Sequence, residues 1–211
     1  IVYIRATSNL KRCVALGGAK NHLLVFPDAN PEMTASNVVA SMSGCAGQRC
    51  MAASVMVGVD KVQHIIDRMV HEAKTIVPGD NLGSVITAEA KDRIERYIAE
   101  AEENGAKILL DGRNATVAGK EGGYYVGPTI IDYVTTDMSV AREEIFGPVI
   151  SIIRAKDLDE AIAIENGSNY GNAAAVFTQS GGLAKQVMDR ASAGMIGVNI
   201  GVPVPREPFS F

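Results

Sequence analysis

Residues 22–59 read HLLVFPDANPEMTASNVVASMSGCAGQRCMAASVMVGV, and this stretch indicates a strand, a helix and a second strand in succession. Residues 22–27 form a short apolar run, which is typical of a buried strand. Asn30 and Pro31 then read as the start of a helix, with a capping side chain followed by a proline in the first turn. Residues 52–59 are apolar and rich in β-branched side chains, and they predict another strand.

The rest of the chain continues this alternation. Further strands are expected over four apolar runs, at 107–110, 149–153, 173–177 and 195–200. The run 124–131 contains Gly127-Pro128 and is expected to be an edge strand or a bent one. Further helices are expected from the capping residues Asp60, Thr87 and Asp157, and over 183–191. Such alternation predicts an α/β fold with an open, largely parallel sheet and flanking helices.

The composition is that of an ordinary globular protein. Of the 211 residues, 47% are apolar and 21% are charged, which is enough to build a sizeable core. The net charge is −4 without a Lys/Arg-rich run, which argues against nucleic-acid binding, and the longest apolar runs are too short to span a membrane. The three cysteines are an odd number and predict free thiols in a reducing compartment, the cytoplasm or the mitochondrial matrix.

Cys50 is the candidate nucleophile. It follows the small-residue segment 44–47, which leaves room for a substrate beside the sulfur, and it precedes a predicted strand. Attack of its thiolate on a carbonyl carbon would form a covalent intermediate with the substrate. The positive charge of Arg49 favours a thiolate beside it. The alternative is a buried structural cysteine, since free cysteines are among the most buried residues.

Three motifs in the same order identify a family resemblance that covers essentially the whole chain. Gly47-Gln48-Arg49-Cys50 resembles the active-site segment of the aldehyde dehydrogenase superfamily. The segment EEIFGPV at 143–149 resembles its second signature, and NYGNAAAVFT at 169–178 resembles a third. The resemblance implies an NAD-dependent oxidoreductase that acts on a small-molecule aldehyde.

The same resemblance implies roles for individual residues. Cys50 takes the place of the nucleophile, and Glu144 matches the acid that holds the hydroxyls of the nicotinamide ribose. Phe146 matches an aromatic residue that packs near the nicotinamide. Taken alone, Glu144 would read as a solvated loop acid and Phe146 as a core residue.

Other segments resemble the CoA-acylating branch of the superfamily, the methylmalonate-semialdehyde dehydrogenases. These are ALGGAKNH at 15–22, CMA at 50–52 and VNIGVPVP at 198–205. Most superfamily members carry a water-activating Glu near Leu16, whereas no Glu stands between residues 6 and 30. Coenzyme A would make such a base dispensable. The resemblance therefore implies oxidation of methylmalonate or malonate semialdehyde to propionyl- or acetyl-CoA, with NAD reduction and loss of CO2.

Two further residues take roles from this branch. Arg49 is a candidate for handling the substrate or coenzyme A, the alternative being a salt bridge at the end of a helix. Gly17 matches a backbone position close to the nicotinamide, and would otherwise be a turn residue.

The resemblance also implies a domain organisation. Residues 1–19 are expected to be the tail of a cofactor-binding domain or a linker, and residues 20–211 a catalytic domain whose C-terminal end is truncated. The chain begins without Met and reads as the middle of a longer protein. We expect the full-length protein to be a homo-oligomer, dimer or tetramer, and these residues alone not to turn over.

Alternatives from other classes stay open. His64, Asp67 and His71 share one helical face, a spacing that is able to hold a metal, but that face also reads as a charged surface, so no metal is expected. Within enzymes, the rival is a hydrolytic aldehyde dehydrogenase, against which the missing Glu argues. The remaining alternative is a truncated, non-catalytic α/β module that acts in binding or assembly.

Overall fold

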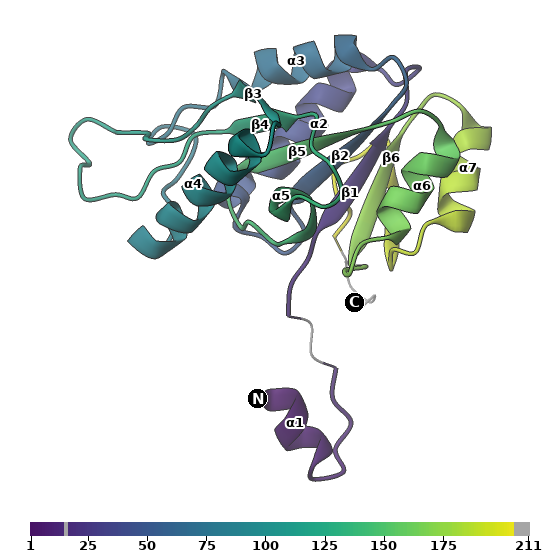
Figure 1. Cartoon of the computed structure of the whole chain (residues 1–211), viewed down its shortest axis with the longest axis horizontal. Coiled ribbons are helices and arrows are strands. Elements are labelled where there is room, and N and C mark those ends of the chain that lie inside the picture. The colour runs from purple at the N-terminus through teal and green to yellow at the C-terminus, as the bar shows by residue number, and fades with distance from the viewer. Residues whose placement is uncertain (15–16, 205–211) are drawn as a thin grey trace.

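The fold is built on one seven-stranded sheet, seen in a computed structural model that describes residues 1–14 and 17–204 (Figure 1). The sheet order is β3-β4-β5-β2-β1-β6-β7. The strands are β1 (Asn21–Val25), β2 (Ala53–Val59), β3 (Lys107–Leu110), β4 (Thr129–Asp132), β5 (Val149–Ala155), β6 (Ala173–Phe177) and β7 (Met195–Val198). All neighbours are parallel except β3 and β4. The predicted α/β fold with a largely parallel sheet is confirmed.

Helices cover both faces of this sheet (Figure 1). The covering helices are α2 (Pro31–Ser43), α3 (Gln63–Ala73), α4 (Ala88–Glu103), α5 (Ser139–Arg142), α6 (Leu158–Asn166) and α7 (Gly181–Arg190), with a short 3-10 turn η1 (Gly44–Gly47). Helix α1 (Val2–Thr7) precedes them and does not contribute to this cover. Alternate residues of β1 enter opposite cores, because successive strand side chains point to opposite faces. Leu23 and Val25 pack with α2 and α3, whereas Leu24 packs with α4 to α7.

Three of the predicted helix starts are confirmed as side-chain caps. Asn30, Thr87 and Asp157 each accept a hydrogen bond from the backbone N–H three residues on. The cap predicted at Asp60 is wrong, since α3 begins only at Gln63. Asp60 has a left-handed φ of 53° and its N–H donates to the Ala155 carbonyl, so it extends the pairing of β2 with β5.

The edge position predicted for 124–131 is also wrong. Only Thr129–Asp132 forms a strand, and it lies between β3 and β5. The antiparallel strand β3 covers its outer side and is itself the edge. Pro128 stands just before the strand, so its missing N–H costs no bond of the ladder. The Gly127 N–H donates a hydrogen bond to the Gly112 carbonyl.

The two ends of the chain differ from this core. Helix α1 has no buried residue and lies away from the sheet (Figure 1). The last strand ends at Val198, two residues earlier than expected, and α7 begins at Gly181, two residues earlier than expected.

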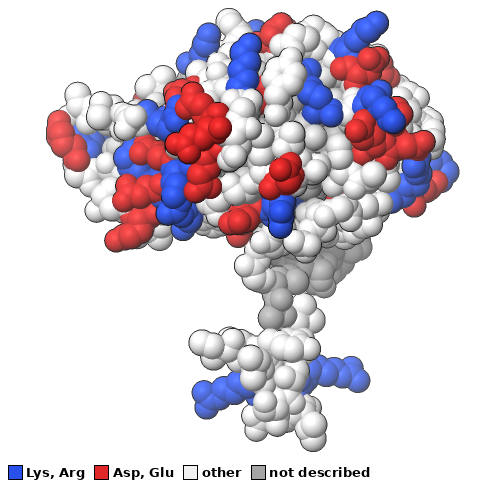
Figure 2. Space-filling model, in the orientation of Figure 1, with Lys and Arg blue, Asp and Glu red and all other residues white. Residues whose placement is uncertain are grey.

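In the described parts of the chain, no helix has the length and hydropathy needed to cross a membrane. Lys and Arg lie intermixed with Asp and Glu over the face shown in Figure 2.

Candidate active site

The three sequence motifs meet at one edge of the sheet. Cys50 precedes β2, the Glu144 segment precedes β5, and Tyr170 precedes β6. These strands run parallel to β1 and lie beside one another, so their amino ends share one edge. Ligands of open α/β sheets usually lie at the carboxyl ends of the strands, so this arrangement is the reverse of the common one.

Cys50 stands in a tight turn at that edge. The Ala52 N–H donates to the Arg49 carbonyl at 3.0 Å, which makes Cys50 and Met51 the two central residues of a β-turn. The Cys50 side chain is exposed. The alternative of a buried structural cysteine is therefore contradicted.

The loop before this turn has a strained backbone. Cys45 and Ala46 adopt left-handed φ/ψ values of 53°/33° and 54°/38°, and Gly47 follows at φ 70°. This conformation raises the free energy of a non-glycine residue, and such strained residues cluster at functional sites. At Gly47 an added Cβ would lie 1.9 Å from the Gly147 carbonyl oxygen. Backbone therefore touches backbone at this point, and the first motif packs directly on the second.

Gln48 ties the same loop to the segment before α4. Its Nε2 donates to the carbonyls of Cys45 at 3.1 Å and Ser84 at 3.3 Å, and its Oε1 accepts from the Ile86 N–H at 3.0 Å. Sequence reasoning assigned no role to Gln48, although an amide that both donates and accepts is suited to such a bridge.

Arg49 lies over the end of α2. Its Nη2 donates to the Ser41 carbonyl at 3.2 Å, and a Cβ on Gly44 would meet that Nη2 at 2.1 Å. The helix-end alternative is thus partly right, but the contact is to a backbone carbonyl, and no ion pair of Arg49 is found among the described residues. The side chain is largely exposed and accessible to a charged substrate.

Phe146 and Glu144 have different neighbours. Phe146 has a left-handed φ of 57° and, with Cys45 and Gln48, lines an open cavity of about 600 Å³. Glu144 is half-buried, and a Cβ on Gly18 would lie 3.3 Å from its Oε2. The carboxylate is therefore neither a fully solvated loop acid nor paired with a basic side chain within 4 Å among the described residues.

A buried lysine lies beside this carboxylate. Lys20 is only 3% exposed, and its Nζ has no hydrogen-bond partner among the described residues. Burial lowers the pKa of Lys20 to about 7, opposed by the negative charges of Glu144 and Glu143. Glu143 in turn accepts a 2.5 Å hydrogen bond from the Tyr97 hydroxyl. Burial, and then this bond, raise the pKa of Tyr97 to about 12.

Two other predicted positions stand apart. Gly17 is exposed and a Cβ there would meet no atom within 4 Å, so Gly18, not Gly17, contacts the Glu144 side of the site. Ala15 and Leu16, at the place of the missing Glu, lie outside the described residues.

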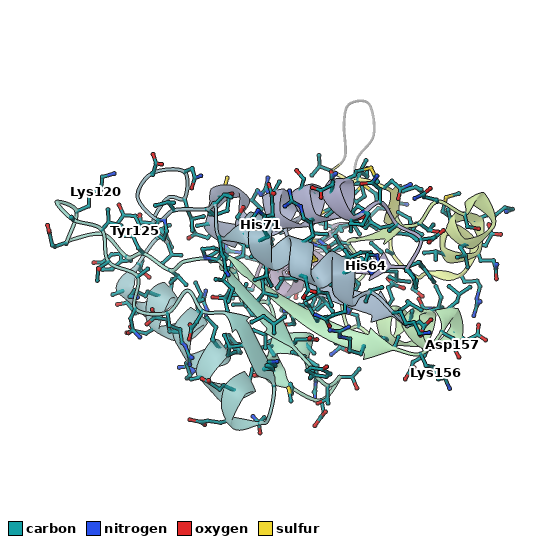
Figure 3. All side chains as sticks on the ribbon, turned by 90° about the horizontal axis from the view of Figure 1, so that it is seen from above. His64, His71, Lys120, Tyr125, Lys156 and Asp157 are labelled. Carbon is teal, nitrogen blue, oxygen red and sulfur yellow. The ribbon has the colours of Figure 1, made fainter. Side chains whose placement is uncertain are left out.

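The histidines of α3 lie on the far side of the sheet from α4, on the outside of the molecule (Figure 3). Asp67 lies between His64 and His71 on the same helix, and its carboxylate accepts a hydrogen bond from the Gln63 side chain at 2.8 Å. Within residues 1–14 and 17–204, no group of three or more His, Cys, Asp or Glu is placed to hold a metal ion.

Comparison with known proteins places this geometry in a family. The model of the aldehyde dehydrogenase family matches residues 1–211. Malonate-semialdehyde dehydrogenase 2 of Bacillus thuringiensis (strain Al Hakam) is 45% identical over 217 residues, a match that covers 100% of this chain and 44% of the relative. Malonate-semialdehyde dehydrogenase 2 of Shouchella clausii is 41% identical with the same coverage. The chain thus spans less than half the length of these relatives.

The solved structures agree. The methylmalonate-semialdehyde dehydrogenase of Oceanimonas doudoroffii superposes with a TM-score of 0.93 at 38% identity, covering 97% of this chain and 43% of that one. With this fold, the three motifs gathered at one edge of the sheet and a family match over its whole length, the chain belongs to the aldehyde dehydrogenase family.

Proposed function

We propose that this chain is the catalytic part of an NAD-dependent, CoA-acylating dehydrogenase of malonate or methylmalonate semialdehyde. The observation that carries the proposal is the contact of Gly47 with Gly147, which brings the exposed Cys50 thiol and the Glu144–Phe146 segment to one site. The names of the relatives, malonate- and methylmalonate-semialdehyde dehydrogenase, support this class of substrate.

The thiol performs the covalent chemistry. The Cys50 sulfur attacks the aldehyde carbon, and the backbone N–H of Cys50 is the proposed donor to the developing oxyanion. Loss of hydride from the thiohemiacetal carbon leaves a thioester on Cys50. The β-carboxylate of the malonyl or methylmalonyl thioester leaves as CO2, and the electron pair of the broken C–C bond forms a thioester enolate that takes a proton from water. Attack by the thiol of coenzyme A then releases acetyl- or propionyl-CoA, and the proton of that thiol returns to the Cys50 sulfur.

The residues present fit a nicotinamide nucleotide beside this thiol. The half-buried Glu144 carboxylate is able to accept two ribose hydroxyls, and the Phe146 ring lines the cavity of about 600 Å³ that opens next to the Cys50 loop. NAD, when bound, supplies the hydride acceptor. The backbone of Gly17 is the proposed contact of the nicotinamide ring.

The missing general base favours coenzyme A over water as the second nucleophile. The one carboxylate between residues 6 and 30 is Asp28, which follows β1 at the opposite edge of the sheet. Its oxygens accept from the Thr178 hydroxyl at 2.8 Å and from the Gln179 N–H at 3.0 Å. Asp28 is therefore engaged in structure away from Cys50. Arg49 is the proposed contact for the carboxylate of the substrate or for coenzyme A.

The domain boundary belongs to the same proposal. Residues 1–19 act as a linker from a cofactor-binding domain and residues 20–211 as the catalytic domain. This division is supported by α1, which has no buried residue, and by the run of buried residues that, in the described part of the chain, begins at Ala19, one residue before the boundary. Three free cysteines are consistent with a reducing compartment such as the cytoplasm. A homo-oligomer is proposed for the full-length protein from the family resemblance alone.

A chimera tests the function, with these 211 residues replacing the matching segment of the Bacillus thuringiensis relative. With malonate semialdehyde and NAD but no coenzyme A, one NADH per site should form quickly, followed by slow turnover. Coenzyme A should raise the steady rate by on the order of 10²-fold or more, since a water-activating base is missing. A Cys50→Ser chimera should show no burst. Fast multiple turnover in buffer, without stimulation by coenzyme A, would contradict the proposal.

A further inference from the structure

The first residue of β1 contacts the turn that carries the nucleophile. Asn21 is 1% exposed and lies directly against Cys50 and Ala52. Its Nδ2 donates to the Cys50 carbonyl at 2.9 Å and to the Ala52 carbonyl at 2.8 Å. The orientation of the amide is unambiguous, because a flipped amide would place its oxygen against two carbonyl oxygens.

The strand ladder is interrupted at this same residue. Asn21 is paired with Ala53, but the next residue, His22, is paired with Val55, so Ser54 has no opposite residue on β1. Such bulges recur beside active sites, where they redirect a segment of chain. The side chain of Asn21 bonds two carbonyls just before the interruption, where regular pairing of the two backbones has not yet begun.

The bonds restrain both peptide planes next to the nucleophile. The plane between Arg49 and Cys50 carries the Arg49 carbonyl, which accepts from the Ala52 N–H. The plane between Cys50 and Met51 carries the Cys50 carbonyl, which accepts from Asn21. Because both planes are held, the direction of the Cys50 Cα–Cβ bond and of the Cys50 N–H is held as well. These two groups are the ones that must meet the aldehyde carbon and its oxygen.

We propose that Asn21 is a positioning residue that aims the Cys50 thiol and N–H through its two bonds to the 50–52 turn. The cost of burial supports a specific role, because the Asn21 Oδ1 is buried without a partner among the described residues. A buried amide with an unpaired oxygen is expensive, whereas an apolar residue would fill the position without that cost. The inference rests on Cys50 as the nucleophile of the proposed function.

Asn21→Leu removes both donors while keeping the number and branching of the side-chain heavy atoms. Asn37→Leu is the matched control, because the Asn37 Nδ2 likewise donates to a backbone carbonyl, that of Met33 at 2.9 Å, but within α2. In the chimera, Asn21→Leu should slow the burst of NADH by on the order of 10²-fold, the usual effect of a misplaced reacting group, with the KM for NAD within twofold. Asn37→Leu should leave the burst rate unchanged.

A second measurement does not depend on activity. In the 211-residue chain, the rate of alkylation by iodoacetamide is followed at each cysteine by peptide mass spectrometry. Asn21→Leu should lower the limiting rate at Cys50 at least about threefold, while Cys45 and Cys13 keep their rates as internal controls. If Asn21→Leu fails to melt cooperatively, Asn21→Ser, which keeps one donor, takes its place and should give an intermediate loss.

The outcomes separate the two proposals. A folded Asn21 variant with an unchanged rate at Cys50, or with equal losses at Cys50 and Cys45, overturns the positioning role. An unsubstituted chimera without aldehyde oxidation contradicts the proposed function instead, and the alkylation rates still decide the role of Asn21.

Discussion

Replacement of Gly47 by alanine should disrupt the joint between the first two motifs. The added Cβ would lie 1.9 Å from the Gly147 carbonyl oxygen and 2.7 Å from the Pro148 nitrogen. These are backbone atoms, which cannot turn aside as a flexible side chain does. The residue also has a φ of +70°, which L side chains rarely adopt.

The magnitude is the sum of two costs. The left-handed conformation costs a non-glycine residue about 1–2 kcal/mol, and forcing an extra methyl into a packed region costs about 1–3 kcal/mol more. We therefore expect Gly47→Ala to lower the free energy of unfolding by about 2–5 kcal/mol.

Two control variants separate these costs. Gly119 has nearly the same φ, +74°, but an added Cβ there meets nothing within 4 Å, so Gly119→Ala measures the backbone cost alone. Gly83 has neither a positive φ nor a close atom, so Gly83→Ala should be nearly neutral. Urea unfolding of the 211-residue chain, followed by circular dichroism, gives all three values. If Gly47→Ala is no less stable than Gly119→Ala, the packing of one motif on the other does not carry the energy assigned to it.

Three other predictions concern ionisable and reactive groups. Burial lowers the pKa of Lys20 from 10.5 to about 7, so between pH 7 and 10.5 Lys20 binds fewer protons in the folded chain than in the unfolded chain. The free energy of unfolding should therefore rise with pH over this window. Lys20→Met should remove that rise, as measured by urea unfolding at pH 7 and pH 9.5; parallel pH dependences of the two proteins would show that Lys20 does not titrate there. Glu144→Gln in the chimera should leave the melting temperature unchanged but lower kcat/KM for NAD by the equivalent of about 1.5–3 kcal/mol, because the amide cannot make two charge-assisted bonds to ribose. Unchanged NAD kinetics would remove Glu144 from the site. Iodoacetamide should alkylate Cys50 ahead of Cys45 and Cys13 in a time course followed by mass spectrometry, since Cys50 is exposed beside Arg49; prior labelling of Cys45 would move the assignment of the nucleophile.

Local signals in the sequence predicted most of the secondary structure. The caps Asn30, Thr87 and Asp157 act within one turn of their own helices, so a short window of sequence contains the whole interaction. Asp60 has the same residue type but bonds through its backbone to Ala155 on another strand. A pattern of neighbouring residues contains no sign of that contact, and the predicted cap was therefore wrong.

The candidate site divides in the same way. Cys50 and Glu144 were named through motifs that are contiguous in sequence, and their assigned roles remain predictions. The side chains of Asn21, Lys20 and Gln48 instead meet groups far away in the sequence. Asn21 bonds the carbonyl of Cys50, 29 residues on, Gln48 bonds that of Ser84, 36 residues on, and Lys20 lies near the charge of Glu144. These contacts depend on how β1, β2 and β5 align their amino ends, which only the three-dimensional structure shows.

The placement of the site at the amino edge of the sheet has an electrostatic consequence. Each helix that returns to this edge arrives with its carboxyl end: α2 ends before the Cys50 loop, the short α5 ends before the Glu144 segment, α6 ends before Tyr170, and α7 ends before β7. Helix carboxyl ends carry partial negative charge, whereas phosphates are bound at amino ends. Under the proposed function, the helix dipoles of α2, α6 and α7 would therefore disfavour the pyrophosphate of a dinucleotide at the edge where its nicotinamide is proposed to react. The exposed cationic side chain of Arg49 offsets part of this field. A dinucleotide would then be oriented by polarity, with its uncharged reactive ring at the sheet and its phosphates facing outward.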